Sequence, residues 1–156
     1  MTKDLNLDEK TIIIYGPIQQ MVQSLATSLT GLGADVALID KQASEMQRFA
    51  DNLMDMRQVN GKNGRAAVIE ADINSAREAK EAVSRAAELF GGVDIYIDAN
   101  FSGRSEWFSK TEAIDGFEDI FHSHLSRSLF MAHAALEFLR GRKRGRVLFM
   151  MNDLKL

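Results

Sequence analysis

The sequence predicts an α/β fold in which a parallel sheet of about five strands carries helices on both faces. Two observations lead to this prediction. Short apolar runs typical of strands alternate with segments of helical periodicity along all 156 residues, and the connections between them are short. The first apolar run, TIIIY at residues 11–15, lacks polar alternation, as expected for a strand covered on both faces.

The first half of the chain provides two strands and two helices. After TIIIY, apolar residues recur at spacings of three and four from Ile18 to Leu32, which marks one buried helix face, and Gly31 and Gly33 end that helix. ADVALID at residues 34–40 is the second strand. A polar helix follows before the turn NGKNG, and its apolar side carries Ala43, Met46, Phe49, Ala50 and Leu53.

The second half continues the alternation. RAAVIEAD at residues 65–72 is the third strand, and SARE at residues 75–78 has the spacing of a capping box that opens a helix to Phe90. GGVDIYIDA at residues 91–99 contains the fourth strand. A polar loop leads to a long helix at residues 114–139, and RVLFMM at residues 146–151 is the fifth strand.

Composition and length fit one globular domain. We expect a single domain over residues 1–156, with residues 1–10 as an N-terminal extension and the end just after the fifth strand. The net charge of −3 favours neither nucleic acid nor membrane as a partner, and zero cysteines exclude disulfides and thiol chemistry. Because the N-terminus is charged and no apolar stretch could span a membrane, we expect a cytoplasmic location.

Four segments carry a resemblance to a known family. They are IIIYGPIQQMVQSLATSLTGLGADVALID, AAVIEADIN, AAELFGGVDIYID and GRVLFMMN. In order and length they resemble the N-terminal half of a short-chain dehydrogenase/reductase, a resemblance that extends from Thr11 to about Asn152. It implies a Rossmann-like, doubly wound sheet and an NAD-dependent oxidoreductase.

The glycine-rich turn of that family is altered here. The family has glycines in a T-G-x-x-x-G-x-G pattern, because the cofactor pyrophosphate approaches the backbone closely. Of these only Gly16 is present, while Gln20 and Val22 stand in place of the other two, and Pro17 removes a backbone N–H. We interpret the turn as a degenerate phosphate site.

The family's catalytic residues are also replaced. Its Asn-Asn-Ala-Gly motif corresponds to residues 98–101, where Phe101 puts a ring in the place of a cofactor sugar. The helix asparagine aligns with His124 and the catalytic serine with Asn152. The Tyr-x-x-x-Lys pair, which passes a proton to the substrate oxygen, is absent, because Tyr15 and Tyr96 are followed four residues later by glutamine and asparagine.

Two acidic residues match the family's cofactor contacts. Asp40 ends the second strand, where the family binds the adenosine ribose, and Asp72 ends the third, where it contacts the adenine. With Gly16 they form a vestigial cofactor-binding set. The alternative is that both aspartates only cap turns, as aspartate often does at strand ends.

These observations lead to a hypothesis with two alternatives. The leading hypothesis is a non-catalytic relative without a cofactor, which acts through protein association as a homodimer or scaffold, using helix 114–139 and strand 146–151. The first alternative is a sensor that binds NAD(H) or an adenine nucleotide through Gly16, Asp40 and Asp72 without reacting. The second is a piece of a longer NAD-dependent oxidoreductase, against which the motif substitutions argue.

Other charged residues do not suggest a site. His122, His124 and His133 share one helix, but no pair has the separation of four residues typical of helical metal ligands, so we expect no metal. The basic run RGRKRGR at residues 140–146 could contact phosphates, but no aromatic residue interleaves it, and a solvated turn is the better interpretation. We therefore do not expect nucleic acid as a partner.

Overall fold

The computed structural model describes residues 6–60, 64–100 and 121–150. Five parallel strands form one sheet with the order β3-β2-β1-β4-β5. The strands are β1 (Thr11–Tyr15), β2 (Asp35–Asp40), β3 (Ala66–Glu70), β4 (Ile95–Asp98) and β5 (Arg146–Phe149). This is the strand order of the doubly wound Rossmann sheet, so the predicted fold class is confirmed.

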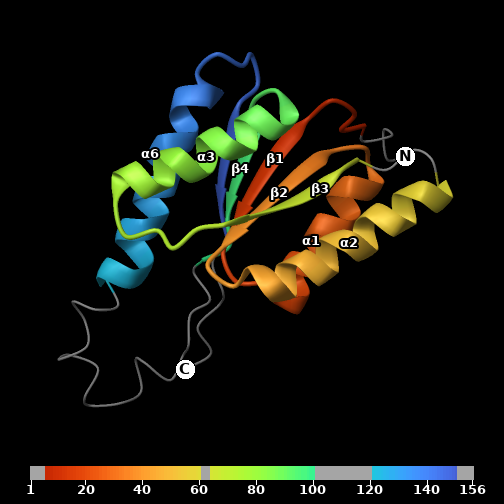
Figure 1. The fold of residues 1–156 in the computed structure, drawn as a ribbon. Coiled ribbons are helices and arrows are strands. Elements are labelled where there is room, and N and C mark those ends of the chain that lie inside the picture. Colours follow the sequence, from red (N-terminus) through yellow and green to blue (C-terminus); the bar gives the residue numbers. More distant parts are fainter. Residues whose placement is uncertain (1–5, 61–63, 101–120, 151–156) are drawn as a thin grey trace, which may run out of the picture.

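Helices cover both faces of the sheet (Figure 1). The helices α1 (Gln20–Gly31) and α2 (Ala43–Asn60) lie on one face, and α3 (Ala76–Phe90) and α6 (Arg127–Leu139) lie on the other. A π-helical turn, η2 (Phe121–Ser126), leads directly into α6. The predicted helix at 114–139 is therefore confirmed over η2 and α6, and its first residues lie outside the described part of the chain.

Strand β1 is apolar at nearly every position because both of its faces are covered. Successive side chains of a strand point to opposite faces. Ile12 and Ile14 pack into the core beneath α1 and α2, whereas Ile13 and Tyr15 pack into the core beneath α3 and α6. All five residues of β1 are buried, because both faces of the central strand are covered.

The two helices that follow β1 and β3 begin in different ways. At the start of α3, the backbone N–H of Glu78 donates to Ser75 Oγ at 3.3 Å, and the Glu78 carboxylate accepts from the backbone N–H of Asn74 at 2.8 Å. The predicted capping at residues 75–78 is thereby confirmed. At the start of α1, the side chain of the N-cap residue Gln19 makes no capping hydrogen bond.

Strand β5 lies at an edge of the sheet. It pairs with β4, and no other described strand pairs with it. Leu148 and Phe149 are 47% and 52% exposed. The predicted strand at 146–151 thus holds for residues 146–149, and residue 151 lies outside the described part. Among the helices that the structure describes, none has the length and apolar character to cross a membrane.

Candidate functional site

The candidate ligand site lies at the carboxyl edge of the sheet. In open parallel sheets, ligands bind outside the carboxyl ends of the strands where the strand order reverses, here between β1 and β4. Gly16 follows β1 directly, while Asp40 and Asp98 are the last residues of β2 and β4. Asp72 comes two residues after β3. The structure therefore places the three predicted residues Gly16, Asp40 and Asp72 at one edge.

Gly16 lets two turns of this edge come together. Its φ is +134°, and a Cβ at this position would lie 2.6 Å from the carbonyl carbon of Ala99 and 2.7 Å from the nitrogen of Asn100. The backbone N–H of Ala99 also donates to the Tyr15 carbonyl at 2.7 Å. A glycine is thus required here by the packing of the β1 turn on the β4 turn.

The N-terminus of α1 follows that turn and is open to an anion. Gln19 has an extended backbone without a side-chain cap, and the first turn of α1 carries no acidic residue. The first N–H groups of a helix lack intrahelical partners and carry partial positive charge, so they can hold a phosphate. Val22, a residue of α1, is only 3% exposed and packs in the core beneath the helix, while Gln20 is exposed. Val22 therefore does not project from the outer surface of this turn.

Asp40 is half-buried beside a hollow of the surface. Burial raises the pKa of its carboxyl above the ordinary 3.8, and hydrogen bonds from the backbone N–H groups of Lys41 and Gln42 oppose that rise. A cavity of about 630 Å³ lies between the start of α2 and the end of β3. It is lined by Lys41, Gln42, Ser44, Glu45, Gln47 and Glu70.

Asp98 is buried at the end of β4 within a hydrogen-bond network. Its carboxylate accepts from Tyr96 Oη at 2.7 Å and from the backbone N–H of Asn100 at 3.0 Å. Burial raises the pKa of Asp98, and the Tyr96 hydrogen bond opposes that rise. Ser128 Oγ lies near enough to lower this pKa as well, but it makes no well-formed hydrogen bond within the part of the chain that the structure describes.

The two tyrosines are unsuited to proton transfer. Burial is the main cause that raises the pKa of Tyr15 and of Tyr96 well above 10.0, so both phenols remain protonated near neutral pH. The Tyr96 hydroxyl donates a buried hydrogen bond to Asp98 and does not face solvent. Both residues therefore belong to the buried frame of the site.

His124 connects η2 to the turn after β4. Its Nδ1 lies 3.3 Å from the Asn100 carbonyl oxygen, and Asn100 Nδ2 donates to the His124 carbonyl at 3.4 Å. The resemblance identified position 124, but not this pairing with Asn100. Phe101 and Asn152 lie outside the described residues, as do Trp107, Phe108 and Asp153.

Arg127 is a residue of this edge that the sequence did not reveal. Its guanidinium donates to Asn74 Oδ1 at 2.9 Å and lies 3.9 Å from the Asp72 carboxylate. The side chain is 26% exposed. The available signal was its spacing of three residues from His124, because residues three and four apart share one helix face.

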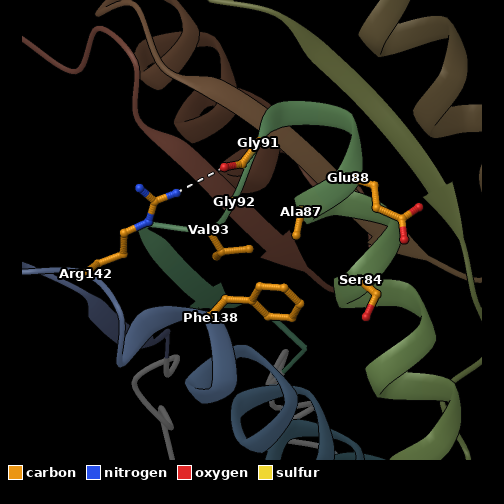
Figure 2. Close-up of a pocket in the computed structure, with 8 residues that line it drawn as sticks. All are labelled: Ser84, Ala87, Glu88, Gly91, Gly92, Val93, Phe138 and Arg142. Carbon is orange, nitrogen blue, oxygen red and sulfur yellow. Dashed lines mark hydrogen bonds between the residues drawn. The ribbon is translucent and has the colours of Figure 1, made fainter.

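A second hollow lies at the opposite edge of the sheet (Figure 2). This cavity, of about 470 Å³, lies between the C-terminal ends of α3 and α6 and the turn before β4. Arg142, from the basic run, points across it, donating to the Gly91 carbonyl at 3.2 Å and lying 3.6 Å from Asp94. Arg142 is thus held by the fold, at the edge away from Gly16 and Asp40.

Within residues 6–60, 64–100 and 121–150, no three acidic or histidine side chains are grouped closely enough to hold a metal ion. Asp40 and Asp98 end β2 and β4, and Asp72 follows β3 at the same edge, but the three do not form such a group.

Comparison with known proteins gives one family. A family model described as short chain dehydrogenase matches residues 10–153. An uncharacterised oxidoreductase of Staphylococcus aureus (strain USA300) is 24% identical over 130 residues, which cover 83% of this chain and 52% of that protein. The chain spans about half the length of the curated relatives it matches.

Several solved structures with the same fold are dehydrogenases. A citronellol catabolism dehydrogenase of Pseudomonas aeruginosa PAO1 has a TM-score of 0.77 and 20% identity, with 98% of this chain and 59% of that chain covered. A short chain dehydrogenase of Mycobacterium smegmatis has a TM-score of 0.75 and 19% identity, with 93% and 59% covered. At this identity the likeness shows the fold alone.

Two expectations from the sequence are wrong. The chain was expected to be no enzyme and to take no cofactor, whereas the matched family and the named relatives are dehydrogenases and oxidoreductases, which typically bind NAD(P). The expectation of no cofactor came from interpreting the altered turn as a degenerate phosphate site. The expectation of no enzyme came from judging a whole catalytic set on a chain that covers about half of its relatives.

Proposed function

The chain belongs to the short chain dehydrogenase family, and from this premise we propose that it is the dinucleotide-binding part of an NAD-dependent oxidoreductase. The observation that carries the proposal is the coincidence of an uncapped helix N-terminus and a half-buried acid at the same sheet edge. These are the start of α1 and Asp40. Such a pair suits a pyrophosphate and a ribose, respectively.

The residues at this edge fit an NAD molecule. The first N–H groups of α1 would hold the pyrophosphate, since no acidic side chain of the first turn competes for them. Asp40 would accept hydrogen bonds from the adenosine ribose, and Asp72 would lie toward the adenine. Because a carboxylate at position 40 repels a 2′-phosphate, we expect NAD(H) to be preferred over NADP(H).

The nicotinamide, when bound, supplies or accepts a hydride. This chain's own residues would bind and orient it, and the pairing of His124 with Asn100 would fix the turn after β4 on the nicotinamide side. The proton-transfer pair of the family is absent from these residues. We therefore assign that step to the part of the relatives' length that this chain does not cover.

Titration of NADH into the purified chain, followed by calorimetry, tests the proposal. We expect a dissociation constant below about 100 μM, which corresponds to roughly −5.5 kcal/mol. Asp40→Ala should weaken binding about tenfold or more, because the ribose loses a charged acceptor. Asp51→Ala, which removes an exposed carboxylate of α2, should leave it unchanged. The absence of binding at millimolar NADH would refute the proposal.

A second proposal concerns association. We propose that the chain contacts a protein surface, most simply a second copy, through α6 and β5. In support, Leu125 and Leu129 on one side of the helix and Leu148 and Phe149 on the edge strand are large apolar side chains exposed by at least 38%. Exposed large apolar side chains and an unpaired strand edge are typical of interfaces.

A further inference from the structure

Three side chains at the start of the α6 helix face the carboxyl edge of the sheet together. Arg127 and Ser128 follow His124 by three and four residues, so each lies near the helix face that carries His124. His124 contacts Asn100 after β4, and Ser128 lies near Asp98 at the end of β4. Arg127 contacts Asn74 in the turn between β3 and α3.

The contacts of Arg127 join two segments that are far apart in sequence. Its guanidinium donates to Asn74 Oδ1 at 2.9 Å, across a separation of 53 residues. The same nitrogen lies 3.9 Å from Asp72 Oδ1. Asn74 is itself fixed, because its backbone N–H donates to Glu78 of the α3 cap. Arg127 therefore ties the helix to a turn that is already held at its other end.

Charge gives Arg127 a second effect on this edge. The carboxylates of Asp98, Asp40 and Asp72 all raise the pKa of Tyr15, and Arg127 lowers it. The guanidinium thus lies within electrostatic reach of Tyr15 at the end of β1, as the three carboxylates do. A dianionic pyrophosphate approaching these carboxylates would be repelled, and a fixed positive charge offsets part of that repulsion.

We propose that Arg127 is a positioning residue for the adenosine half of the dinucleotide. It acts through Asn74 and Asp72, by holding the turn after β3 at a fixed distance from η2. This inference rests on the proposed function of the edge as an NAD site. It adds Arg127 to the site, besides the turn after β1 and Asp40 at the end of β2.

Binding of NADH and of ADP-ribose to the purified chain tests the role of Arg127. Arg127→Gln removes the positive charge and the planar set of N–H donors of the guanidinium. It should raise both dissociation constants about tenfold, as expected for a lost charge-assisted hydrogen bond. Because the effect falls on the adenosine half, the fluorescence emission maximum of bound NADH should stay as in the wild type. The matched control is Arg77→Gln, whose guanidinium is exposed and pairs with Glu81 on the surface of α3.

A double-mutant cycle separates positioning from general damage. If Arg127 acts through the turn, Arg127→Gln should add less than about twofold to the loss already caused by Asp72→Asn with Asn74→Ala. Full additivity, or an unchanged affinity in Arg127→Gln, would overturn the role of Arg127 while the NAD site stands. A wild-type chain that binds neither NADH nor ADP-ribose would overturn the proposed function and this inference together.

Discussion

The backbone of Gly16 lies so close to Ala99 that a Cβ at position 16 would come within 2.6 Å of the Ala99 carbonyl carbon. This contact fixes the turn after β1 against the turn after β4, at the point where the strand order of the sheet reverses. Both the start of α1 and the Asn100–His124 pairing depend on the same contact, because each follows one of the two turns. The candidate site therefore rests on a glycine whose main role is packing.

Replacing Gly16 should be costly for stability. Gly16→Ala puts a Cβ into backbone atoms and requires a φ of +134° from an L side chain. We expect the free energy of unfolding to fall by about 2 kcal/mol or more, from strain and overpacking together. Urea denaturation followed by circular dichroism measures it. Gly31→Ala is the control, since a Cβ there meets nothing within 4 Å, and a change above about 1 kcal/mol in that variant would contradict the argument.

The sequence was sufficient for the fold because each element carries a local signal. The unbroken run TIIIY becomes a central strand, and the capping spacing of Ser75 and Glu78 opens α3 as predicted. The family resemblance added the Rossmann-like, doubly wound arrangement of the sheet. These signals depend on residues that are near one another in the chain.

The contacts of the site could not be predicted in the same way. Arg127 with Asn74 and His124 with Asn100 join segments separated by 53 and 24 residues. Such pairs depend on how far the helix sits from the strand ends, which no spacing in the sequence specifies.

The basic turn contributes to stability through one of its arginines. Arg142 donates to the Gly91 carbonyl and pairs with Asp94, and Asp94 accepts from the backbone N–H of Thr11 at 3.0 Å. Arg142→Gln should lower the free energy of unfolding by about 1 kcal/mol, because the pair is partly exposed. Asp94→Ala should cost more, about 1–3 kcal/mol, because the Thr11 N–H loses its partner in a buried place.

Thermal or urea unfolding of these two variants tests that ranking. Arg144→Gln is the matched control, since it removes an exposed arginine from the same turn. Its free energy of unfolding should stay within about 0.5 kcal/mol of the wild type. Equal losses in Arg142→Gln and Arg144→Gln would mean that only the net charge of the turn matters.

The buried carboxyl of Asp98 should give stability a pH dependence of defined sign. Its pKa is raised in the folded protein, so the folded state binds more protons than the unfolded chain at pH values between 3.8 and the raised pKa. The free energy of unfolding therefore falls as pH rises from the ordinary value through the folded one. Asp98→Asn should make this fall shallower at pH values above 3.8, as measured by urea denaturation at each pH.

Tyr96→Phe provides a test with the opposite sign. The Tyr96 hydroxyl donates to Asp98 and lowers its pKa, so its removal should raise that pKa further and make the fall with pH steeper. If both variants shift the pH dependence in the same direction, the Asp98 carboxyl is not its source.

Association through α6 and β5 is the last prediction, and it has a matched control in α3. Leu129 on α6 is 54% exposed and Leu89 on α3 is 53% exposed, so both offer similar apolar surface to a partner. We expect the wild-type chain to be dimeric or larger at micromolar concentration by size-exclusion chromatography with light scattering. Leu129→Glu should shift it to the monomer, because a charge placed in an apolar interface is costly, whereas Leu89→Glu should not. A wild-type monomer, or equal shifts in both variants, would exclude α6 as the interface.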